Sequence, residues 1–402
     1  MQFVVAAYGS RGDVEPCAAV AAELLRRNHD VRMAVPPNLL GFIESAGLAG
    51  FAYGPDSREE MNPGSDLVRK IAPRMQNPFS VVPDVVEHVT EVKLQKGATL
   101  SALAKGADLV LASFNEQGLA ANVAEYYGIP VAAVHPFPER VWSSDWLFSR
   151  MTKVAEDAQR RTLGLPEATG PAAASLAIQA YDEFCLPQPT AQWVDVDPHR
   201  PFVGALTLDL PTDNDDEVLS WIAGGTPPIY FGFGSTPISS PADMFPMISA
   251  ACAQLGERVL ICSGPNDATA VEPSDHVKVV DVVNHSAVFP ACRAIVHHGG
   301  AGTTAAALRA GIPSLILWHW LDQPLWAAAV QQLEVGFGRR FSDTNMETLV
   351  ADLRVLLSPH YSSRAREVAV RMTKPAESLA KAADLLELSH GGPGASAAFR
   401  WR

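Results

Sequence analysis

The sequence has few positive charges, few cysteines and no long hydrophobic run. Its 402 residues carry a net charge of −13. That balance argues against nucleic acid as a partner, because a protein that binds the phosphate backbone needs a basic face. The five cysteines are odd in number and show no C-x-x-C spacing. We therefore expect neither a disulfide framework nor a zinc site, and the cysteines fit a reducing compartment.

Two further absences concern the membrane and the nicotinamide cofactors. No apolar segment is long enough to cross a bilayer, and no signal peptide precedes the first predicted strand. We expect a cytoplasmic protein, or one that is peripheral at the inner face of the plasma membrane. The first glycine loop, Gly9 to Gly12, lacks the G-x-G-x-x-G fingerprint of dinucleotide-binding proteins.

Apolar strands alternate with amphipathic helices from the start of the chain. Gln2 to Ala7 is a continuous apolar run, a helical pattern follows from Pro16 to about Arg27, and Val31 to Val35 is the next strand. This alternation predicts an α/β fold with doubly wound parallel sheets. The length allows two domains, joined by a proline-rich linker from Pro187 to Pro211. Ligands of such sheets bind at the carboxyl ends of the strands, where Ser10 to Asp13 falls.

The most informative stretch runs from His297 to Trp326. An apolar run, Ala294 to Val296, leads into the glycine loop HHGGAGTT, and an alanine-rich helix follows and ends at Gly311. A glycine loop that opens a helix presents unpaired backbone N–H groups beside the positive end of the helix dipole, which suits a phosphate. The glycines allow a close approach. From spacing alone, a tight turn with two neighbouring histidines is the alternative.

The loop HHGGAGTT, followed one helix and one strand later by Asp322-Gln323-Pro324, resembles the donor-binding signature of the GT-B-fold glycosyltransferases. The most similar members are the bacterial enzymes that glycosylate glycopeptide antibiotics, macrolides and mycobacterial glycopeptidolipids. The resemblance implies two Rossmann-like domains that face each other across a cleft, an acceptor-binding domain in residues 1–200 and a nucleotide-sugar-binding domain in 201–361. It also implies that a helix over 362–388 packs back on the first domain. Residues 389–402 are predicted to be disordered.

The start of the chain extends this resemblance. Residues 9–16, GSRGDVEP, match the opening of the antibiotic glycosyltransferases, in which the aspartate acts as the base that deprotonates the acceptor hydroxyl. The resemblance assigns that role to Asp13. An aspartate at this position also serves well as a helix N-cap, and both roles can hold at once. The other residues that the resemblance places near the acceptor are Ser10, Arg11, Gly12 and His135.

The resemblance also assigns the donor-binding residues. Val283 and Asn284 lie in the loop that holds the pyrimidine base in the family, with an ordinary strand-to-helix connection as the alternative. Asp322 and Gln323 would hold sugar hydroxyls beside Trp318, because a carboxylate and an amide offer both acceptors and donors; a surface turn is the alternative. The diphosphate would be bound by Ser235, His297, His298, Gly299, Gly300, Gly302 and Thr303.

The implied reaction is an inverting, metal-independent transfer of a hexose or a deoxyhexose such as rhamnose. The donor would be a dTDP- or UDP-sugar, and the acceptor a hydroxyl of a hydrophobic natural product or lipid, with a glycopeptidolipid as the leading candidate. This chemistry needs a base near the acceptor oxygen and charge stabilisation at the departing diphosphate. We expect no cofactor beyond the co-substrate and no metal, because the D-x-D triplet Asp213-Asn214-Asp215 lies just before a helix whose dipole favours acidic residues.

Two other functions fit parts of this pattern. A sugar-nucleotide epimerase on the same fold would bind the donor and turn over without an acceptor. A non-catalytic relative would bind nucleotide sugars but is expected to have lost Asp13 or the histidines, all of which are present. The basic amphipathic stretch from Asp66 to Asn77 either faces a core or lies on an anionic membrane surface. The oligomeric state stays open between monomer and dimer.

Overall fold

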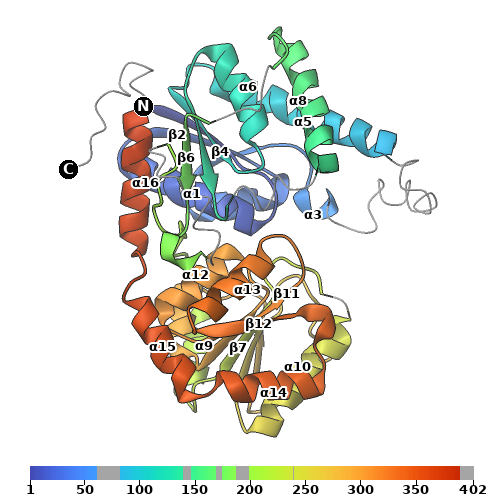
Figure 1. Cartoon of the computed structure of the whole chain (residues 1–402), viewed down its shortest axis with the longest axis vertical. Coiled ribbons are helices and arrows are strands. Elements are labelled where there is room, and N and C mark those ends of the chain that lie inside the picture. Colours follow the sequence, from blue (N-terminus) through green and yellow to red (C-terminus); the bar gives the residue numbers. More distant parts are fainter. Residues whose placement is uncertain (61–81, 139–145, 169–173, 187–198, 239, 390–402) are drawn as a thin grey trace. The chain divides into compact units, whose positions relative to one another are not determined.

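The computed structural model describes residues 1–60, 82–138, 146–168, 174–186, 199–238 and 240–389 (Figure 1). The chain forms two compact units, and each contains one six-stranded parallel sheet. The first unit comprises Met1–Ala180, Val196–Leu208 and Pro375–Arg402, and the second comprises Tyr181–Asp195 and Asp209–Lys374. These ranges differ from the predicted division at residue 200, because residues 201–208 group with the first unit and residues 181–186 with the second.

The sheet of the first unit has the order β3-β2-β1-β4-β5-β6. The strand order reverses between β1 and β4, so the carboxyl ends of these two strands form the switch point at which open α/β sheets bind ligands. The strands are β1 (Gln2–Ala6), β2 (Asp30–Val35), β3 (Ala49–Ala52), β4 (Leu109–Ser113), β5 (Val131–His135) and β6 (Leu176–Gln179).

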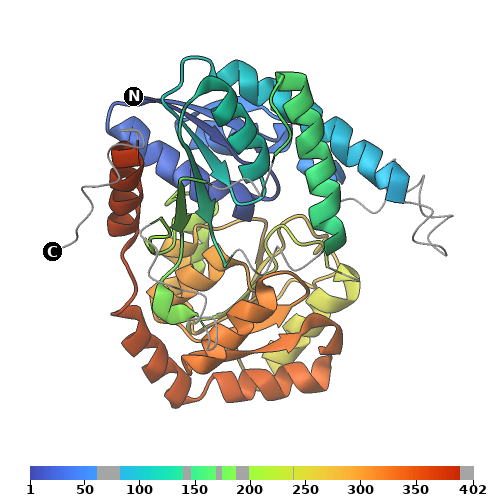
Figure 2. The same ribbon diagram turned by 45° about the horizontal axis from the view of Figure 1, so that its top comes forward.

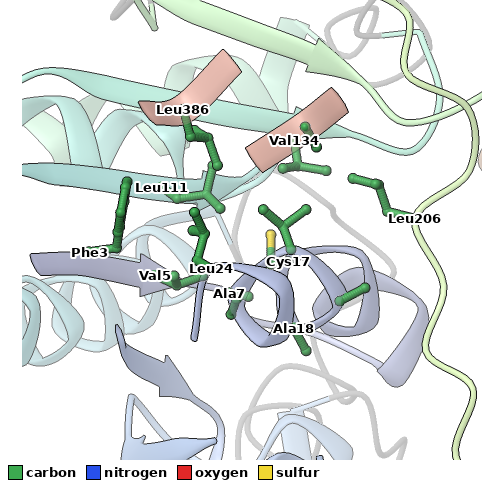
Figure 3. Packing of buried hydrophobic residues seen from close by; sticks show 14 of the residues in the cluster. Phe3, Val5, Ala7, Cys17, Ala18, Leu24, Leu111, Val134, Leu206 and Leu386 are labelled. Carbon is green, nitrogen blue, oxygen red and sulfur yellow. The ribbon is translucent and has the colours of Figure 1, made fainter. Parts of the chain in front are cut away.

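Helices cover both faces of this sheet. Alternate residues of β1 face opposite layers, so that Phe3 and Val5 pack with α1 and α16 (Figure 3) while Val4 and Ala6 pack with α5 and α6. On the second face, α5, α6 and α8 lie side by side (Figures 1 and 2). The helices of this unit are α1 (Arg11–Arg26), α2 (Leu40–Ser45), α3 (Ser57–Glu60), α5 (Val82–Ala104), α6 (Gln117–Tyr127), α8 (Trp146–Leu163) and α16 (Pro375–Ser389), with the short 3-10 helix η1 (Pro37–Leu39).

The sheet of the second unit has the order β12-β11-β10-β7-β8-β9, with its switch point between β7 and β10. Its strands are β7 (Ile229–Gly232), β8 (Val259–Cys262), β9 (Val277–Val280), β10 (Ala294–His297), β11 (Ser314–Trp318) and β12 (Gly336–Arg340). Its helices are α9 (Asp215–Ala223), α10 (Pro241–Leu255), α11 (His285–Val288), α12 (Ala301–Ala310), α13 (Gln323–Gln332), α14 (Met346–Leu356) and α15 (Pro359–Ala369), with the 3-10 helices η4 (Glu183–Cys185), η6 (Phe289–Ala291) and η7 (Phe341–Asp343).

The first helix begins earlier than the sequence predicts. The structure starts α1 at Arg11 instead of Pro16, and Ser10, with φ −78° and ψ 174°, is its N-cap. The prediction of Asp13 as the N-cap is therefore wrong, because Asp13 is the third residue of the helix. Pro16 lies within the helix, where its missing N–H removes one backbone hydrogen bond.

The predicted C-terminal helix over 362–388 is two helices in the structure. Helix α15 ends at Ala369 and α16 begins at Pro375, whose ring disfavours a helical residue before it. Helix α15 belongs to the second unit and α16 to the first. Arg27 at the end of α1 bonds Asp384 at 2.6 Å and Glu387 at 2.9 Å on α16.

Some predicted segments lie outside the described residues. They are the amphipathic stretch Asp66 to Asn77, residues 187–198 of the proline-rich linker predicted from Pro187 to Pro211, and the tail from residue 390. Within the part of the chain that the structure describes, no helix is both long and apolar enough to cross a membrane.

Candidate functional site

The loop after β1 fixes the carboxylate of Asp13 at the switch point of the first sheet. Asp13 Oδ2 accepts hydrogen bonds from Ser10 N at 2.6 Å and from Ser10 Oγ at 2.8 Å. Gly9 has φ +127°, and a Cβ on it would lie 2.4 Å from Asp13 Oδ2, so only glycine allows this approach. Burial raises the pKa of Asp13, and the two bonds from Ser10 oppose that rise. An oriented carboxylate with a raised pKa is suited to accept a proton.

The other predicted acceptor residues have different environments. Arg11 pairs with Glu15 at 2.8 Å and lies over the ring of Phe42, while Gly12 is exposed in the first turn of α1. His135 ends β5 and is 1% exposed, so its side chain is part of the interior of the first unit. The structure thus joins Ser10 and Asp13 by hydrogen bonds, and the roles of all four residues toward an acceptor stay predictions.

In the second unit, the loop between β10 and α12 is held by a buried histidine. His297 is 0% exposed, and its Nδ1 accepts a hydrogen bond from Gly299 N at 3.1 Å. Gly299 has φ +96°, and a Cβ there would lie 2.7 Å from Ile316 Cγ2. Gly300 is the N-cap of α12, so Gly302 and Thr303 lie in its first turn. In this structure His297 orients the glycine loop, and its predicted contact with a diphosphate stays untested.

The ring of His298 lies between two glycine loops. A Cβ on Gly234, in the loop after β7, would lie 2.7 Å from His298 Cε1, and a Cβ on Gly300 would lie 2.6 Å from Nε2. Burial, helped by the nearby His319, lowers the pKa of His298 to about 4, and a hydrogen bond with the backbone of Gly232 opposes this shift. The imidazole is therefore neutral at pH 7.

These two loops form a surface that is suited to an anion. They end the neighbouring strands β7 and β10 at the switch point of the second sheet. The first turn of α12 points its backbone N–H groups to this edge, and a helix N-terminus attracts a phosphate. His297 Nε2 is a buried nitrogen that bonds no described residue, and Ser235, next to Gly234, is exposed.

The predicted sugar-binding residues are buried at the start of α13, so the alternative of a plain surface turn is wrong for them. Asp322 Oδ2 accepts a bond from Trp326 Nε1 at 2.9 Å. Gln323 Oε1 accepts bonds from His319 N at 2.7 Å and Trp320 N at 3.3 Å. The amide nitrogen of Gln323 bonds no residue that the structure describes, so it can donate to a ligand. Trp318, at the end of β11, lies with its ring 5.9 Å from the Arg340 guanidinium carbon.

The loop between Trp318 and Asp322 holds a strained residue. Leu321 has φ +55°, a conformation that costs a branched side chain free energy, and such strain clusters at functional sites. Leu321 and its neighbour Trp320 are about half exposed.

The predicted nucleobase loop is held by acidic side chains. Asn284 donates its backbone N–H to Asp215 Oδ1 at 2.8 Å and its amide to Asp209 Oδ1 at 2.7 Å, and the adjacent Val283 is buried. Asp215 also accepts bonds from Thr212 N and Oγ1 at 2.8 and 2.7 Å. Asp215, the last residue of the D-x-D triplet, therefore has a structural role: it connects the segment of Thr212 to the loop of Asn284. Among the described residues, no three His, Cys, Asp or Glu side chains form a group that could hold a metal ion.

Two further residues, His319 and Asp209, lie at this site. The sequence suggests His319, together with Trp318 and Trp320, as a wall of a deoxysugar pocket or as plain core, and it assigns Asp209 no role. His319 follows β11, stacks on Phe341 with centroids 4.2 Å apart, and has a buried Nε2 that bonds no described residue. Its position directly after a strand is a signal that sequence reasoning can use. Asp209 bonds both Asn284 and Ser286, and it lies in a proline-rich stretch that carries no such signal.

Comparison with known proteins agrees with this arrangement. The N-terminal domain of glycosyltransferase family 28 matches residues 3–142, and the C-terminal domain of erythromycin biosynthesis protein CIII-like proteins matches residues 250–388. An uncharacterized glycosyltransferase of Mycobacterium tuberculosis is 56% identical over 96% of this chain and 98% of its own. The vancomycin aglycone glucosyltransferase of Amycolatopsis orientalis is 28% identical over 92% of this chain and 93% of its own.

Solved structures share the fold at low identity. The spinosyn rhamnosyltransferase SpnG has a TM-score of 0.71 and 17% identity over 96% of this chain and all of its own. The glycosyltransferase VinC, solved in complex with dTDP, has a TM-score of 0.67 and 19% identity over 97% of this chain and 99% of its own. With two matching domains and a relative of more than half identity along its length, the chain belongs to the GT-B-fold glycosyltransferases, in the group of the bacterial antibiotic glycosyltransferases.

Proposed function

We propose that this glycosyltransferase moves a hexose or deoxyhexose, with a rhamnose-like sugar as the first candidate, from a dTDP- or UDP-sugar to a hydroxyl of a hydrophobic acceptor. The binding of dTDP by VinC and the rhamnosyl transfer named for SpnG support this choice of donor. The structural use of Asp215, whose carboxylate bonds Thr212 and Asn284, supports a reaction without a metal.

The observation that carries this proposal is the fixed carboxylate of Asp13. As the acceptor oxygen attacks the anomeric carbon, its proton passes to Asp13, the new C–O bond forms, and the bond from the anomeric carbon to the diphosphate breaks. A direct displacement of this kind inverts the anomeric centre. The departing diphosphate gains charge, which the first turn of α12 and the imidazole of His298 are suited to stabilise.

A mycobacterial lipid such as a glycopeptidolipid is the acceptor class that we propose. The relatives at 56% identity come from mycobacteria, and a relative with a named acceptor, the vancomycin aglycone glucosyltransferase, acts on a natural product. A lipid acceptor would bring the protein to the inner face of the plasma membrane, as a peripheral protein.

A panel of donors and acceptors tests this function. The purified protein is incubated with dTDP- and UDP-activated glucose and rhamnose, each alone and each with a glycopeptidolipid aglycone, a macrolide or a sterol. Mass spectrometry detects transfer, and NMR spectroscopy identifies the anomeric configuration of the product and any epimer of the donor. We expect sugar transfer to the lipid and a new glycoside of inverted configuration. Epimerised donor in the samples without acceptor would instead support an epimerase, and binding of donor without any turnover would support a non-catalytic relative.

A further inference from the structure

A buried ion pair lies at the carboxyl edge of the first sheet, beside the strand that leads to Asp13. Lys96 of α5 places its Nζ 2.6 Å from Glu116 Oε1, and the two side chains are 5% and 2% exposed. Tyr53, just after β3, donates its hydroxyl to the second carboxylate oxygen, Oε2, at 2.6 Å. Each oxygen of the buried carboxylate therefore has a donor, which a charge in the interior requires.

The same lysine packs on Tyr8, the tyrosine that precedes the Gly9 to Gly12 part of the loop after β1. Lys96 Nζ lies 4.1 Å from the ring centroid of Tyr8, which is a cation–π contact. The Tyr8 hydroxyl donates to Pro55 O at 3.2 Å. Gly54 has φ +71°, and a Cβ on it would lie 2.9 Å from Lys96 Cγ and 3.1 Å from Tyr8 Cε2. The ring of Tyr8 is thus held by Lys96, Pro55 and the close approach of Gly54.

The backbone of Tyr8 is fixed as well. Asn115 Nδ2 donates to Tyr8 O at 2.7 Å, and the Asn115 side chain is in turn bonded by Ser113 Oγ at 2.6 Å. Two residues after Tyr8, Ser10 donates both of its bonds to Asp13 Oδ2. Lys96 therefore contacts Tyr8, the backbone leads from Tyr8 through Gly9 to Ser10, and Ser10 bonds the carboxylate.

We propose that Lys96, Glu116 and Tyr8 are positioning residues, which hold the loop after β1 so that Asp13 meets the acceptor hydroxyl. This inference rests on the proposed function of Asp13 as the base. A buried ion pair is a weak source of stability, because hydrophobic residues of similar volume often replace one without loss. A role in orientation accounts for the position of this ion pair beside residues that follow β1, β3 and β4. Small displacements of a reacting group reduce rates strongly.

The first test replaces Lys96 with methionine, which keeps most of the volume and removes the charge. We expect Lys96→Met to lower kcat by about tenfold or more, with the Kd for dTDP unchanged, because the predicted donor residues all belong to the second unit. The assay uses the donor and acceptor pair that gives the most transfer in the panel above. A kcat within about twofold of the wild type would overturn the proposal.

Lys93→Met is the matched control. Lys93 lies on the same helix, is similarly buried, and pairs with Glu156 of α8 at 3.2 Å instead of contacting Tyr8. It should lose thermal stability as Lys96→Met does and keep its kcat. Equal losses of kcat in both variants would show that loosening α5 is sufficient, and would contradict a specific role for Lys96.

A double variant separates stability from positioning. In Lys96→Met/Glu116→Gln a neutral amide replaces the carboxylate that lost its charged partner. The amide oxygen can still accept the bond from Tyr53. We expect thermal stability to recover toward the wild type while kcat stays low, since the ring of Tyr8 still lacks the cation. Recovery of kcat together with stability would overturn the proposal.

The acidity of the acceptor provides a readout that a structural defect does not change. A phenol needs less help from a base than an aliphatic alcohol does, so a misplaced Asp13 should matter less for a phenolic acceptor. We expect the kcat deficits of Lys96→Met and Asp13→Asn to be smaller with a phenol than with an alcohol. Equal deficits for both acceptors would contradict action through the base.

Combining the two substitutions completes the test. If Lys96 acts through Asp13, Lys96→Met should add little to the loss already caused by Asp13→Asn. Losses that multiply would overturn the positioning role while leaving Asp13 as the base. Normal turnover in Asp13→Asn alone would overturn both the positioning role and the proposed function, so the two failures are distinguishable.

Discussion

Two hydrogen bonds join Ser10 to the carboxylate of Asp13 at the start of α1. Ser10 is the N-cap of the helix, and it donates both its backbone N–H and its hydroxyl to the same carboxylate oxygen of Asp13, at 2.6 and 2.8 Å. The second oxygen, Oδ1, accepts no bond from any residue that the structure describes. One oxygen therefore fixes the side chain, and under the proposed function the other would accept the proton of the acceptor hydroxyl.

The low pKa of His298 predicts that nucleotide binding is coupled to proton uptake. With a pKa of about 4, the ring is neutral at pH 7, and a bound diphosphate should raise this pKa. Between the pKa of His298 in the free protein and its higher pKa in the complex, binding takes up protons. The affinity for the nucleotide therefore increases as the pH falls through this window. Calorimetry of dTDP binding in buffers of different ionisation enthalpy measures the uptake.

His298→Asn is the control for this coupling, because the diphosphate itself can exchange protons on binding. The variant should take up fewer protons than the wild type and bind dTDP more weakly. If the wild type and the variant took up the same number of protons on binding dTDP, His298 would not contact the diphosphate.

The interior strands of both sheets and the edge strand β9 could be predicted from the sequence, and the edge strands β3, β6 and β12 could not. Strands such as β4 and β11 are covered on both faces, so they are continuous apolar runs. Strands β3, β6 and β12 lie at sheet edges. The residues of β3 are largely exposed, and β12 has the sequence GFGRR, so neither shows an apolar pattern.

Asp322→Ala and Gln323→Ala should weaken binding of the sugar-nucleotide more than binding of dTDP. Losing a hydrogen bond to a sugar hydroxyl costs about 1–3 kcal/mol. Calorimetry with dTDP-glucose and with dTDP gives the two affinities. Gln331→Ala, an exposed glutamine on the same helix, should change neither. Equal losses for both ligands would show that Asp322 and Gln323 only hold their loop.

Transfer should be independent of divalent metal ions. The carboxylate of Asp215 accepts hydrogen bonds from Thr212 and Asn284, so we expect full activity in excess EDTA. Asp213→Asn should behave as the wild type, whereas Asp215→Asn should lose thermal stability and affinity for dTDP, since it loosens the nucleobase loop. Restoration by Mn²⁺ of activity lost in EDTA would refute this prediction.

Helix α16 should stabilise the first unit through its buried face. Leu386 is fully buried in the core that it shares with Phe3 and Leu24, so Leu386→Ala should lower the free energy of unfolding by about 2–5 kcal/mol. Leu388, on the same helix, is 55% exposed, and Leu388→Ala should change the free energy of unfolding by less than about 0.5 kcal/mol. Denaturant unfolding followed by circular dichroism measures both. Equal effects would mean that α16 does not pack on the first unit in solution.

The motif residues could be located from the sequence, but their partners could not. The loops after β1, β10 and β11 lie at strand ends, where spacing and strand order predict them. The contacts of Tyr8 with Pro55, Lys96 and Asn115 join residues far apart in the chain, and no local pattern indicates them. The same holds for Asp209, whose bonds to Asn284 and Ser286 exist only in the folded second unit.

The most direct test of the whole account is the turnover of Asp13→Asn. Asparagine has nearly the same shape, and its Oδ1 can accept the bonds from Ser10, so the variant should fold and bind dTDP as the wild type does. It cannot accept the acceptor's proton, and loss of general-base assistance is typically worth about 10²–10⁴-fold in rate. Single-turnover transfer from dTDP-sugar, measured with thermal stability and dTDP affinity as controls, should therefore slow by at least about 10²-fold. An unchanged transfer rate at normal stability and affinity would contradict the assignment of Asp13 as the base.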